Sequence, residues 1–403
     1  MFLTWTDFPE AYDSSDLVQK LDFEPQLPVS KSLNSHLFIQ GDNYPVLQKM
    51  LCSGWQNQVD IIYIDPPYNT GNTFTYKDNF STSCDRHSAW LSFMFRRLRL
   101  AKEILCEKGC IFIAINQSEL YTLKLLCDQI FGEDNFVNDF MWLTGKGKKD
   151  KWSRTLQQHT LCYAKNKNKL EAFVEMEFSD WAHSNPDDDP RGNWFSGSIS
   201  FTEKRSNPNH KNYYLIKSPS GKAWTRQWMR TQEEMNTLIR ENKIYWGKAP
   251  EFNQVPRVKI FNNEPSEIIP KNIIDCTQST RQAQAHLDKL LGRKSAFDNP
   301  KPVDLILHLF KITQQKKDAL IMDFFAGSGT TFEAVLNLNK SDGGNRKCIL
   351  IQKPEPPQKE NGFSSIADLC WERIQKTIAN SPDGFLEVQK ITLKQKKTED
   401  QIL

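Results

Sequence analysis

The stretch Val59–Tyr68, VDIIYIDPPY, gives the clearest indication of the fold. Apart from Asp60, its first six residues are apolar or β-branched, and such a run indicates a strand that is buried on both faces of a parallel sheet. Its last four residues, Asp65-Pro66-Pro67-Tyr68, follow at the carboxyl end of that strand. Open α/β sheets bind their ligands at this end. We therefore expect a parallel sheet with a ligand site directly after Ile64.

Short apolar runs alternate with helical patterns on both sides of this stretch. Further strands are predicted at His36–Gln40, Cys110–Ile115, Thr160–Ala164, Ala319–Met322 and Lys347–Ile351. Helices are predicted at Tyr44–Leu51, Ser88–Leu105, Leu120–Phe131, Val303–Phe310 and Thr330–Leu338. This alternation predicts an α/β fold with a doubly wound, mostly parallel sheet that Lys347–Ile351 closes.

The alternation stops near Lys167 and resumes near Phe297, which indicates a core with a second domain inserted into it. The intervening segment is rich in Asn, Pro, Lys and Trp, and DDDPRGN and SPSGK within it are typical of turns. The expected parts are an N-terminal extension (1–35), a first core part (36–166), the insertion (167–290), a second core part (291–390) and a basic, frayed tail (391–403).

The formal net charge of +3 conceals an uneven distribution. Between Thr144 and Lys259 there are 21 Lys and Arg against 13 Asp and Glu, and six of the eleven tryptophans. These tryptophans are Trp152, Trp181, Trp194, Trp224, Trp228 and Trp246. A basic, aromatic-rich segment fits a nucleic-acid-binding insertion. It equally fits a solvated surface over a small core built from tryptophan.

Composition excludes several other classes of protein. The 403 residues are 38% hydrophobic and 25% charged, as in soluble globular proteins. No apolar run approaches the roughly 20 residues that a membrane span needs, and the N-terminus lacks the pattern of a signal peptide. The nine cysteines show no CxxC pair, so we expect reduced thiols and a cytoplasmic protein.

Asp65-Pro66-Pro67-Tyr68 suits chemistry on the exocyclic amine of a nucleobase. The lone pair of such an amine is delocalised into the ring, so the amine needs hydrogen-bond acceptors that favour a pyramidal nitrogen. Asp65 offers a carboxylate, and the Pro66 carbonyl offers a second acceptor on a turn that Pro67 stiffens. Tyr68 offers a face for an extruded base, worth about 1–3 kcal/mol. The alternative is a proline turn with a capping Asp.

A glycine-rich turn, Asp323–Thr331 (DFFAGSGTT), follows the predicted strand at Ala319–Met322. Its glycines allow the backbone to approach a ligand, and the next helix presents free N–H groups. The turn differs from the P-loop motif, and Phe332 stands where G-x-G-x-x-G has its last small residue. Alone, the turn could be a bare strand-to-helix connection. Together, the two turns indicate methylation of an amine, with no metal required.

At these residues the chain resembles the β class of amino-methyltransferases, in which the catalytic motif precedes the cofactor motif. It is more specifically similar to the modification (Mod) subunits of type III restriction–modification systems. The shared segments run from about His36 to Glu355 and include LFIQGDNYPVLQKM, DIIYIDPPYNTGN, GCIFIAINQSE, DPRGNW, FDNPKPVDLI, DFFAGSGTTFEAVLNLN and DGGNRKCILIQKPE. The resemblance implies a Rossmann-like, S-adenosylmethionine-dependent core with an inserted target-recognition domain that binds double-stranded DNA.

The resemblance also implies roles for single residues. The catalytic residues would be Asp65, Pro66, Pro67 and Tyr68, a motif more usual for adenine N6 than for cytosine N4. The residues that bind S-adenosylmethionine would be Asp42, Asp65, Lys301, Asp323, Phe324, Ala326, Gly327, Ser328, Gly329, Thr330 and Gln352. Asp42 would approach the adenine end of the cofactor, and Lys301 its methionine carboxylate. Gln352 stands where an acidic residue commonly holds the ribose.

The expected function is site-specific methylation of the N6 amine of a flipped adenine, in restriction–modification or as a solitary enzyme. A methyltransferase acting on cytosine N4 or on RNA, and a non-catalytic DNA-binding protein that retains the fold, are the alternatives. The resemblance implies a homodimer. The chain is shorter than typical Mod subunits, which argues against a stable restriction subunit as partner and favours a solitary or type II-like enzyme.

Overall fold

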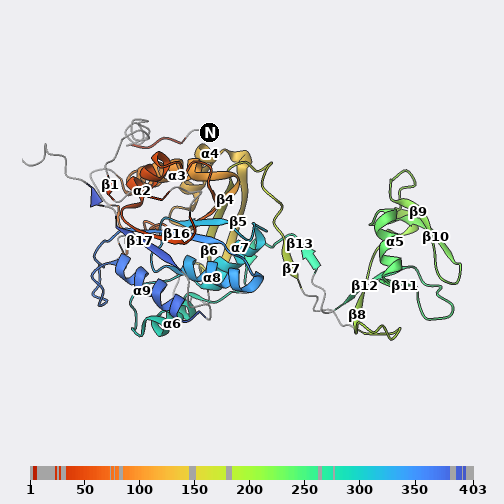
Figure 1. Ribbon diagram of the computed structural model, residues 1–403. Helices are drawn as coiled ribbons and strands as arrows, with labels where there is room; N and C mark the ends of the chain where they lie inside the picture. The colour runs from red at the N-terminus through yellow and green to blue at the C-terminus, as the bar shows by residue number, and fades with distance from the viewer. Residues whose placement is uncertain are drawn as a thin grey trace, which may run out of the picture. The chain divides into compact units, whose positions relative to one another are not determined.

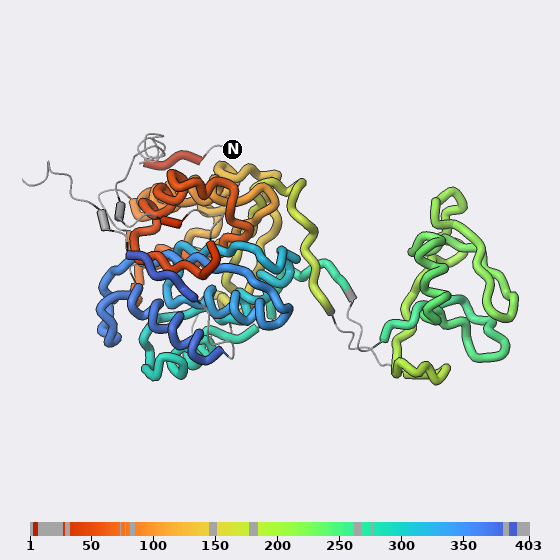
Figure 2. Tube along the Cα trace, viewed as in Figure 1, coloured from red at the N-terminus to blue at the C-terminus, as the bar shows by residue number. Residues whose placement is uncertain are grey.

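A computed structural model describes residues 3–6, 23–24, 27–28, 33–72, 74–76, 78–80, 85–144, 151–177, 184–261, 266–275, 277–381, 387–392 and 394–395. The chain divides into two compact units (Figure 1). The first combines Met1–Val174 with Pro270–Leu403, and the second is Glu175–Ile269. Figure 2 shows the early part of the chain (orange) and its last part (blue) within the same unit.

The first unit is built on a nine-stranded sheet in the order β14-β5-β6-β4-β3-β15-β16-β2-β17. Its strands are β2 (His36–Gln40), β3 (Val59–Ile64), β4 (Leu105–Ile115), β5 (Phe136–Leu143), β6 (Gln157–Ala164), β14 (Ile273–Ile274), β15 (Leu320–Asp323), β16 (Lys347–Gln352) and β17 (Val388–Thr392). Strand β6 is antiparallel to both of its neighbours, and every other pairing in this sheet is parallel. The predicted doubly wound, mostly parallel sheet is confirmed.

Helices cover both faces of this sheet (Figure 1). They are α2 (Asn43–Cys52), α3 (Arg86–Ile104), α4 (Leu120–Phe131), α6 (Thr280–Leu291), α7 (Val303–Ile312), α8 (Thr330–Asp342) and α9 (Ile366–Ala379). Side chains of β3 alternate between two cores: Ile62 and Ile64 pack with α2, α3 and α4, whereas Ile61 and Tyr63 pack with α7, α8 and α9. Burial on both faces explains the nearly continuous apolar run of β3.

The chain order in the sheet reverses between β3 and β15. Ile61 and Ile62 of β3 pair with Ile321 and Met322 of β15, while β4 lies beyond β3, and β16 and β2 lie beyond β15. Such a reversal opens a crevice at the carboxyl ends of the two strands. The Asp-Pro-Pro-Tyr turn and the glycine-rich turn both begin there, although more than 250 residues separate them.

Two expectations about the sheet are wrong. Lys347–Ile351 was expected to close it, but β16 is an interior strand, with β2 and then β17 beyond it. The chain around Lys390 was expected to be frayed, but it forms the edge strand β17. There Ile391 is buried, and the Lys390 ammonium lies 5.1 Å from the ring centre of Trp371. Polar residues fit this strand because one of its edges faces no other strand of the sheet.

The second unit has its own small core. It contains β7 (Glu175–Glu177), β8 (Trp194–Gly197), β9 (Tyr213–Lys217), β10 (Ala223–Gln227), α5 (Gln232–Arg240), β11 (Ile244–Tyr245), β12 (Arg257–Phe261), β13 (Ser266–Ile268) and the 3₁₀ turn Glu203–Arg205. Trp224, Trp228 and Trp246 pack together in that core, and Trp194 is also buried. These four tryptophans therefore serve packing. Trp152 is 89% exposed, and Trp181 lies outside the described residues.

The Asp187–Asp189 turn has both solvent-exposed and structural residues, since Asp187 and Asp188 are exposed. Asp189 is buried and receives hydrogen bonds from Arg191 and from Lys259 Nζ, the latter at 2.7 Å. Asp187 lies 2.6 Å from the same ammonium and accepts a bond from the Trp194 indole. A lysine that is 1% exposed needs such carboxylate partners, because an unpaired buried charge is costly.

The boundaries and charge of the second unit differ from the expected insertion. The expected insertion was 167–290, but 270–290 belong to the first unit, where Leu287 and Leu291 of α6 pack against Ile366 and Leu369 of α9. The second unit contains 13 Lys and Arg and 13 Asp and Glu. The basic excess lies before it, since Thr144–Val174 contains 8 Lys and Arg against 2 Asp and Glu.

Candidate active site

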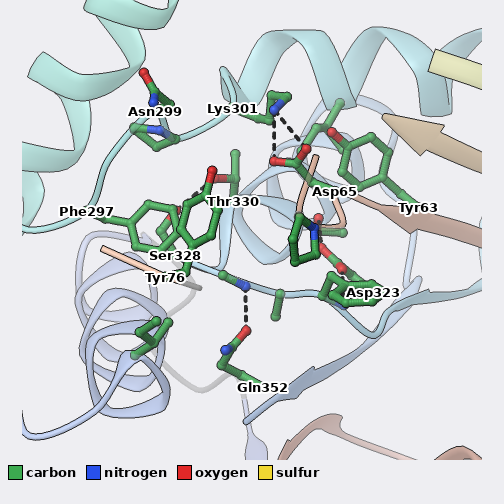
Figure 3. A pocket seen from close by; sticks show the side chains of 18 of the residues that line it. Tyr63, Asp65, Tyr76, Phe297, Asn299, Lys301, Asp323, Ser328, Thr330 and Gln352 are labelled. Carbon is green, nitrogen blue, oxygen red and sulfur yellow. Dashed lines mark hydrogen bonds and ion pairs between the residues drawn. The ribbon is translucent and has the colours of Figure 1, made fainter. Parts of the chain in front are cut away.

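The two turns at the chain-order reversal line one cleft of the first unit (Figure 3). The empty space in the cleft, counted together with the solvent at its mouth, is about 670 Å³. Nine of the predicted site residues line it: Asp65, Pro67, Lys301, Asp323, Ala326, Gly327, Ser328, Thr330 and Gln352. The fold thus brings together residues from both ends of the chain.

Asp65, directly after β3, is held by two partners. Lys301 Nζ lies 2.8 Å from each of its carboxylate oxygens (Figure 3). The Tyr68 hydroxyl donates to Oδ1 at 2.6 Å. The Lys301 side chain is only 8% exposed, whereas that of Asp65 is 29% exposed. Burial, together with the charge of Asp65, raises the pKa of Tyr68 well above its ordinary value, so the hydroxyl remains a donor.

These bonds leave one defined position on Asp65 for a further donor. An ionised carboxylate has about four lone-pair positions, two on each oxygen. Oδ1 uses two of them, for Tyr68 and Lys301, and Oδ2 uses one, for Lys301. The remaining position, on Oδ2, can accept a hydrogen bond from a ligand in the cleft.

Lys301 has a partner that the sequence did not predict. It was expected to meet a ligand carboxylate, but it pairs with Asp65 and lies 5.0 Å from the ring centre of Tyr68. Its position follows from the Asn-Pro-Lys-Pro segment that leads into α7, since Pro302 precedes the first residue of that helix. A further contact of Lys301 with a ligand stays a prediction.

The glycine-rich turn has the left-handed backbone that glycine permits. Gly327 has φ 52° and Gly329 has φ 81°. A Cβ would lie 3.3 Å from Phe297 Cζ at the first position and 3.0 Å from Cys370 Sγ at the second. Gly329 has no side chain that could cap α8, and among the first N–H groups of that helix the one of Phe332 donates to the Gly329 carbonyl at 3.2 Å.

Asp323, the last residue of β15, is a buried carboxylate that shapes this turn. It accepts hydrogen bonds from the Phe325 N–H at 2.9 Å and the Thr331 hydroxyl at 2.6 Å. Burial raises its pKa to about 7, and the charge of Asp65 contributes to the increase. Asp65 and Asp323 are therefore carboxylates of one cleft in different environments: Asp65 is paired with a cation, and Asp323 is held by neutral donors.

Gln352, at the end of β16, is bonded to the glycine-rich turn. Its side-chain Oε1 accepts from the Gly327 N–H at 2.7 Å (Figure 3), and its backbone carbonyl accepts from the Gly41 N–H at 3.0 Å. Through its side chain and its backbone, Gln352 thus ties the turn after β15 to the loop after β2. Whether the amide also reaches a ribose stays a prediction.

A second cleft adjoins the first, because Pro67, Phe325, Gln352 and Glu355 line both. Asp42 and Phe324 also line this second cleft. The Asp42 carboxylate caps α2 through the Tyr44 N–H at 3.0 Å and lies 3.1 Å from Arg97 Nη2. The predicted contact of Asp42 with the adenine end of a cofactor stays a prediction.

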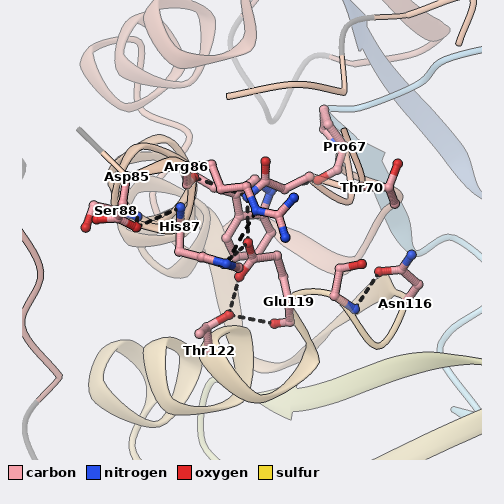
Figure 4. Close-up of polar contacts among 12 residues, drawn as sticks. Pro67, Thr70, Asp85, Arg86, His87, Ser88, Asn116, Glu119 and Thr122 are labelled. Carbon is pink, nitrogen blue, oxygen red and sulfur yellow. Dashed lines mark hydrogen bonds and ion pairs between the residues drawn. The ribbon is translucent and has the colours of Figure 1, made fainter. Parts of the chain in front are cut away.

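The chain after Tyr68 is fixed by two buried carboxylates, Asp78 and Glu119. Figure 4 shows Glu119 with His87 and Thr122. Asp78 accepts from the N–H groups of Asn69 and Thr70 at 2.9 and 3.0 Å. The Asn69 side chain donates to Glu119 Oε1 at 2.6 Å, and His87 Nδ1 lies 2.6 Å from the same oxygen. These contacts hold Asn69 at φ 57° and so fix the exit from the Asp-Pro-Pro-Tyr turn.

Three predicted residues, Pro66, Tyr68 and Gly329, line neither cleft. Pro66 is buried, and the neighbouring Pro67 carbonyl accepts a bond from the Trp90 indole at 2.7 Å. The roles of the Pro66 carbonyl and of the Tyr68 ring toward a base stay predictions. Several lining residues were missed: Tyr63, Tyr76, Phe297, Asn299, Phe325, Thr331 and Glu355. Phe297 and Asn299 could have been found beside Lys301 in FDNPKP, whereas Tyr76 carries no such signal.

Two kinds of site are not seen among the residues that the structure describes. Within these ranges, no three His, Cys, Asp or Glu side chains are grouped so that they could hold a metal ion. None of the described helices is long and apolar enough to cross a membrane.

The parallel sheet with one antiparallel strand, and the two turns at its chain-order reversal, define the class of Rossmann-like methyltransferases. The chain matches the DNA methylase family N6_N4_Mtase over residues 59–355 and belongs to it. It is 32% identical to the Mod subunit of the type III restriction–modification enzyme StyLTI of Salmonella typhimurium, over 92% of this chain and 63% of the relative. It is 33% identical to the EcoPI Mod subunit of Escherichia phage P1, over 90% of this chain and 65% of the relative.

A relative of similar length is the type II methyltransferase M.KpnI of Klebsiella pneumoniae. It is 32% identical over 87% of this chain and 89% of its own length. The chain therefore spans slightly less than two thirds of the two Mod subunits and most of M.KpnI. The resemblance to Mod subunits is confirmed, and the similarity extends to type II enzymes.

Proposed function

We propose that this protein transfers a methyl group from S-adenosylmethionine to the N6 amine of an adenine flipped out of duplex DNA. The observation that carries the proposal is the remaining acceptor position of Asp65 Oδ2, in a cleft that the glycine-rich turn also lines. The names of the relatives, type III Mod subunits and a type II methyltransferase, support DNA as the substrate.

The residues of the two clefts fit an elongated cofactor with an amino-acid end and a nucleoside end. Gly327 and Gly329 carry no side chain where a ligand would approach the backbone, and Ser328 and Thr330 add hydroxyls. Gln352 lies between this turn and the second cleft, which contains Asp42. When bound, S-adenosylmethionine supplies an electrophilic methyl group.

The chain itself supplies orientation and a place for the hydrogen bonds of the amine. Lys301 and Tyr68 hold the Asp65 carboxylate in one orientation. In this orientation Oδ2 accepts a hydrogen bond from the amine of the base, which increases the electron density on the amine nitrogen. The Pro66 carbonyl is the proposed second acceptor. With S-adenosylmethionine bound, the amine nitrogen would attack the methyl group in line as the sulfur–methyl bond breaks. S-adenosylhomocysteine would leave, and the amine would lose its proton to water late in the step.

Adenine N6 is preferred over cytosine N4 because Asp stands first in the four-residue motif, where enzymes of the cytosine type often have Ser. Both reactions need the same acceptors, so the geometry of Asp65 alone does not separate them. We assign target recognition to the second unit, Glu175–Ile269, with Lys204, Lys217 and Lys222 among its exposed cations. The homodimer and an association with DNA in the bacterial cytoplasm belong to the same proposal.

The test is transfer of labelled methyl from S-adenosylmethionine to duplex DNA of mixed sequence, followed by digestion to nucleosides. Labelled N6-methyldeoxyadenosine is the expected product. Labelled N4-methyldeoxycytidine would keep the chemistry and overturn the choice of base. Labelling of RNA but not of DNA would overturn the substrate. Absence of transfer by a chain that binds S-adenosylhomocysteine would favour a non-catalytic protein or a requirement for a partner subunit.

A further inference from the structure

A buried arginine, Arg373 on α9, lies against the glycine-rich turn. Its Nη1 donates to Thr330 Oγ1 at 2.8 Å, to Ser328 Oγ at 3.0 Å and to the Ser328 carbonyl at 3.4 Å. Its side chain is 2% exposed. Neither the sequence motifs nor the lining of the cleft includes Arg373, yet it contacts two residues that do line the cleft.

The charge of Arg373 is balanced within the first unit. Its Nη2 lies 2.9 Å from Glu333 Oε2, and Glu333 Oε1 lies 2.7 Å from Nε2 of His286. Burial raises the pKa of Glu333, but the hydrogen bond from His286 and the charge of Arg373 outweigh burial and leave that pKa below its ordinary value. An ionised Glu333 explains how a guanidinium is retained in the core.

Arg373 determines the direction in which the two hydroxyls can donate. A guanidinium has donors and no acceptor, so at Ser328 and at Thr330 it occupies a lone pair of the hydroxyl oxygen. Each hydroxyl hydrogen must therefore point to some other acceptor. The two oxygens lie 3.3 Å apart, so one hydrogen can bridge them, and the other is available to an acceptor in the cleft.

The surroundings favour an anionic acceptor at this point. The turn leads into the N-terminus of α8, where the dipoles of the helix give a partial positive charge. Lys301, the cation expected to meet a carboxylate, is paired with Asp65. A carboxylate would thus meet the two hydroxyls and the start of α8.

We propose that Arg373 is a positioning residue that directs the hydroxyls of Ser328 and Thr330 toward the carboxylate of the amino-acid end of the cofactor. This inference rests on the proposed function, because it concerns the same cofactor site. It predicts that Arg373 contributes to the affinity for ligands that carry the carboxylate and does not contribute to the affinity for ligands that lack it. A merely structural arginine would affect both kinds of ligand equally.

Calorimetric titration of the full chain with S-adenosylhomocysteine and with 5′-methylthioadenosine, which has no amino-acid part, separates these roles. Arg373→Met should lower the affinity for S-adenosylhomocysteine at least tenfold, which is about 1.4 kcal/mol or more of binding free energy. The affinity for 5′-methylthioadenosine should not change. Lys376→Met is the matched control, because Lys376 lies on the same helix, bonds the Leu291 carbonyl and is 40% exposed. It should change neither affinity.

The outcomes distinguish the inference from the proposed function. Equal weakening of both ligands by Arg373→Met, or no change in either, would overturn the role of Arg373 while leaving the cofactor site in place. Failure of the unchanged chain to bind either ligand would overturn the cofactor assignment and this inference together. Should Arg373→Met not fold, Ser328→Ala combined with Thr330→Val should show the same selective loss, and retained binding of S-adenosylhomocysteine would overturn the proposal.

Discussion

At the scale of single residues, Asp65 combines a fixed orientation with one remaining acceptor position, and Asp65→Asn tests both. The amide keeps the shape of the carboxylate but replaces one oxygen by a donor, which cannot accept from Lys301 or from an amine. We expect methyl transfer to fall by at least about 100-fold, the usual scale for a positioned proton acceptor, and S-adenosylhomocysteine binding to persist.

The control for this change is Asp304→Asn, in the first turn of α7, where the carboxylate accepts from the Gln278 and Leu305 N–H groups and does not line the cleft. It should retain transfer. Single-turnover rates and calorimetry measure the two effects. Full activity of Asp65→Asn would remove the carboxylate from the mechanism, and loss of cofactor binding would make its role one of binding.

Asp323 should make the stability of the protein depend on pH. Its pKa is raised by burial to about 7 in the folded chain, against about 4 in an unfolded one. Between these values the folded state binds the extra proton, so the free energy of unfolding should fall as pH rises from about 4 through 7 and level off above. Asp323→Asn should lose this component. Urea unfolding at pH 5 and pH 8 measures the difference, and an identical pH response in the two proteins would contradict it.

Contacts between residues that are far apart in the chain could not be predicted from the sequence. The two turns could be predicted because a strand and its following residues are adjacent in the chain. The pairing of Lys301 with Asp65 joins positions 236 residues apart, and no local pattern encodes it. Arg373 and Tyr76 were missed for the same reason, since each reaches the site only through packing of distant elements.

At the scale of elements, the turn that begins α8 should be more sensitive than the turn that ends it. Gly329 and Gly343 flank this helix and are both left-handed, with φ 81° and 67°. Gly343→Ala meets no atom within 4 Å and should cost only backbone strain, about 1–2 kcal/mol. Gly329→Ala adds a contact at 3.0 Å with Cys370 Sγ and displaces the turn.

We therefore expect both alanine variants to be less stable, and only Gly329→Ala to lose affinity for S-adenosylhomocysteine. Chemical unfolding and calorimetry measure the two quantities on the same samples. Equal affinities in the two variants would show that the conformation of Gly329 is irrelevant to the ligand.

The elements that the sequence predicted are those with strong apolar patterns, such as β3, β16 and α4. The missed ones in the first unit include β5, β17, α6 and α9. Strand β17 is polar because it lies at an edge, and α6 buries only Ala283, Leu287 and Leu291. In such elements tertiary contacts, rather than intrinsic pattern, determine the structure.

At the scale of the whole molecule, the sequence predicted an inserted unit from its basic charge and its tryptophans, and neither feature has the expected meaning. Its tryptophans mostly form its core, and its charges balance. The basic excess belongs to Thr144–Val174, which includes the exposed Trp152 with Lys151 at 4.6 Å from its ring centre. Electrostatic attraction to DNA should therefore depend on this segment as well as on the second unit.

The contribution of Thr144–Val174 to DNA binding can be tested through the salt dependence of that binding. Lys151→Ala with Arg154→Ala should reduce the slope of log K against log salt by about one for each phosphate that the variant no longer neutralises, whatever the DNA sequence. Lys340→Ala, an exposed lysine of α8, is the control and should leave the slope unchanged. Fluorescence anisotropy at several salt concentrations measures it. An unchanged slope in the double variant would contradict a phosphate-binding role.

The second unit can be removed at a point that the structure defines. Strands β7 and β13 pair antiparallel, with Glu177 opposite Ser266, so the chain enters and leaves the unit through one ribbon. Replacing residues 178–265 by Asn-Gly would close this ribbon with a two-residue hairpin turn. Both clefts are lined by the first unit alone, so this variant should fold and bind S-adenosylhomocysteine as the full chain does.

The methylation of DNA by this variant should lose site specificity, because the residues that recognise bases would be removed with the second unit. Sequencing of the modified positions measures the specificity. Retention of the same methylated sites would place recognition in the first unit, where the basic segment Thr144–Val174 would be the next region to test.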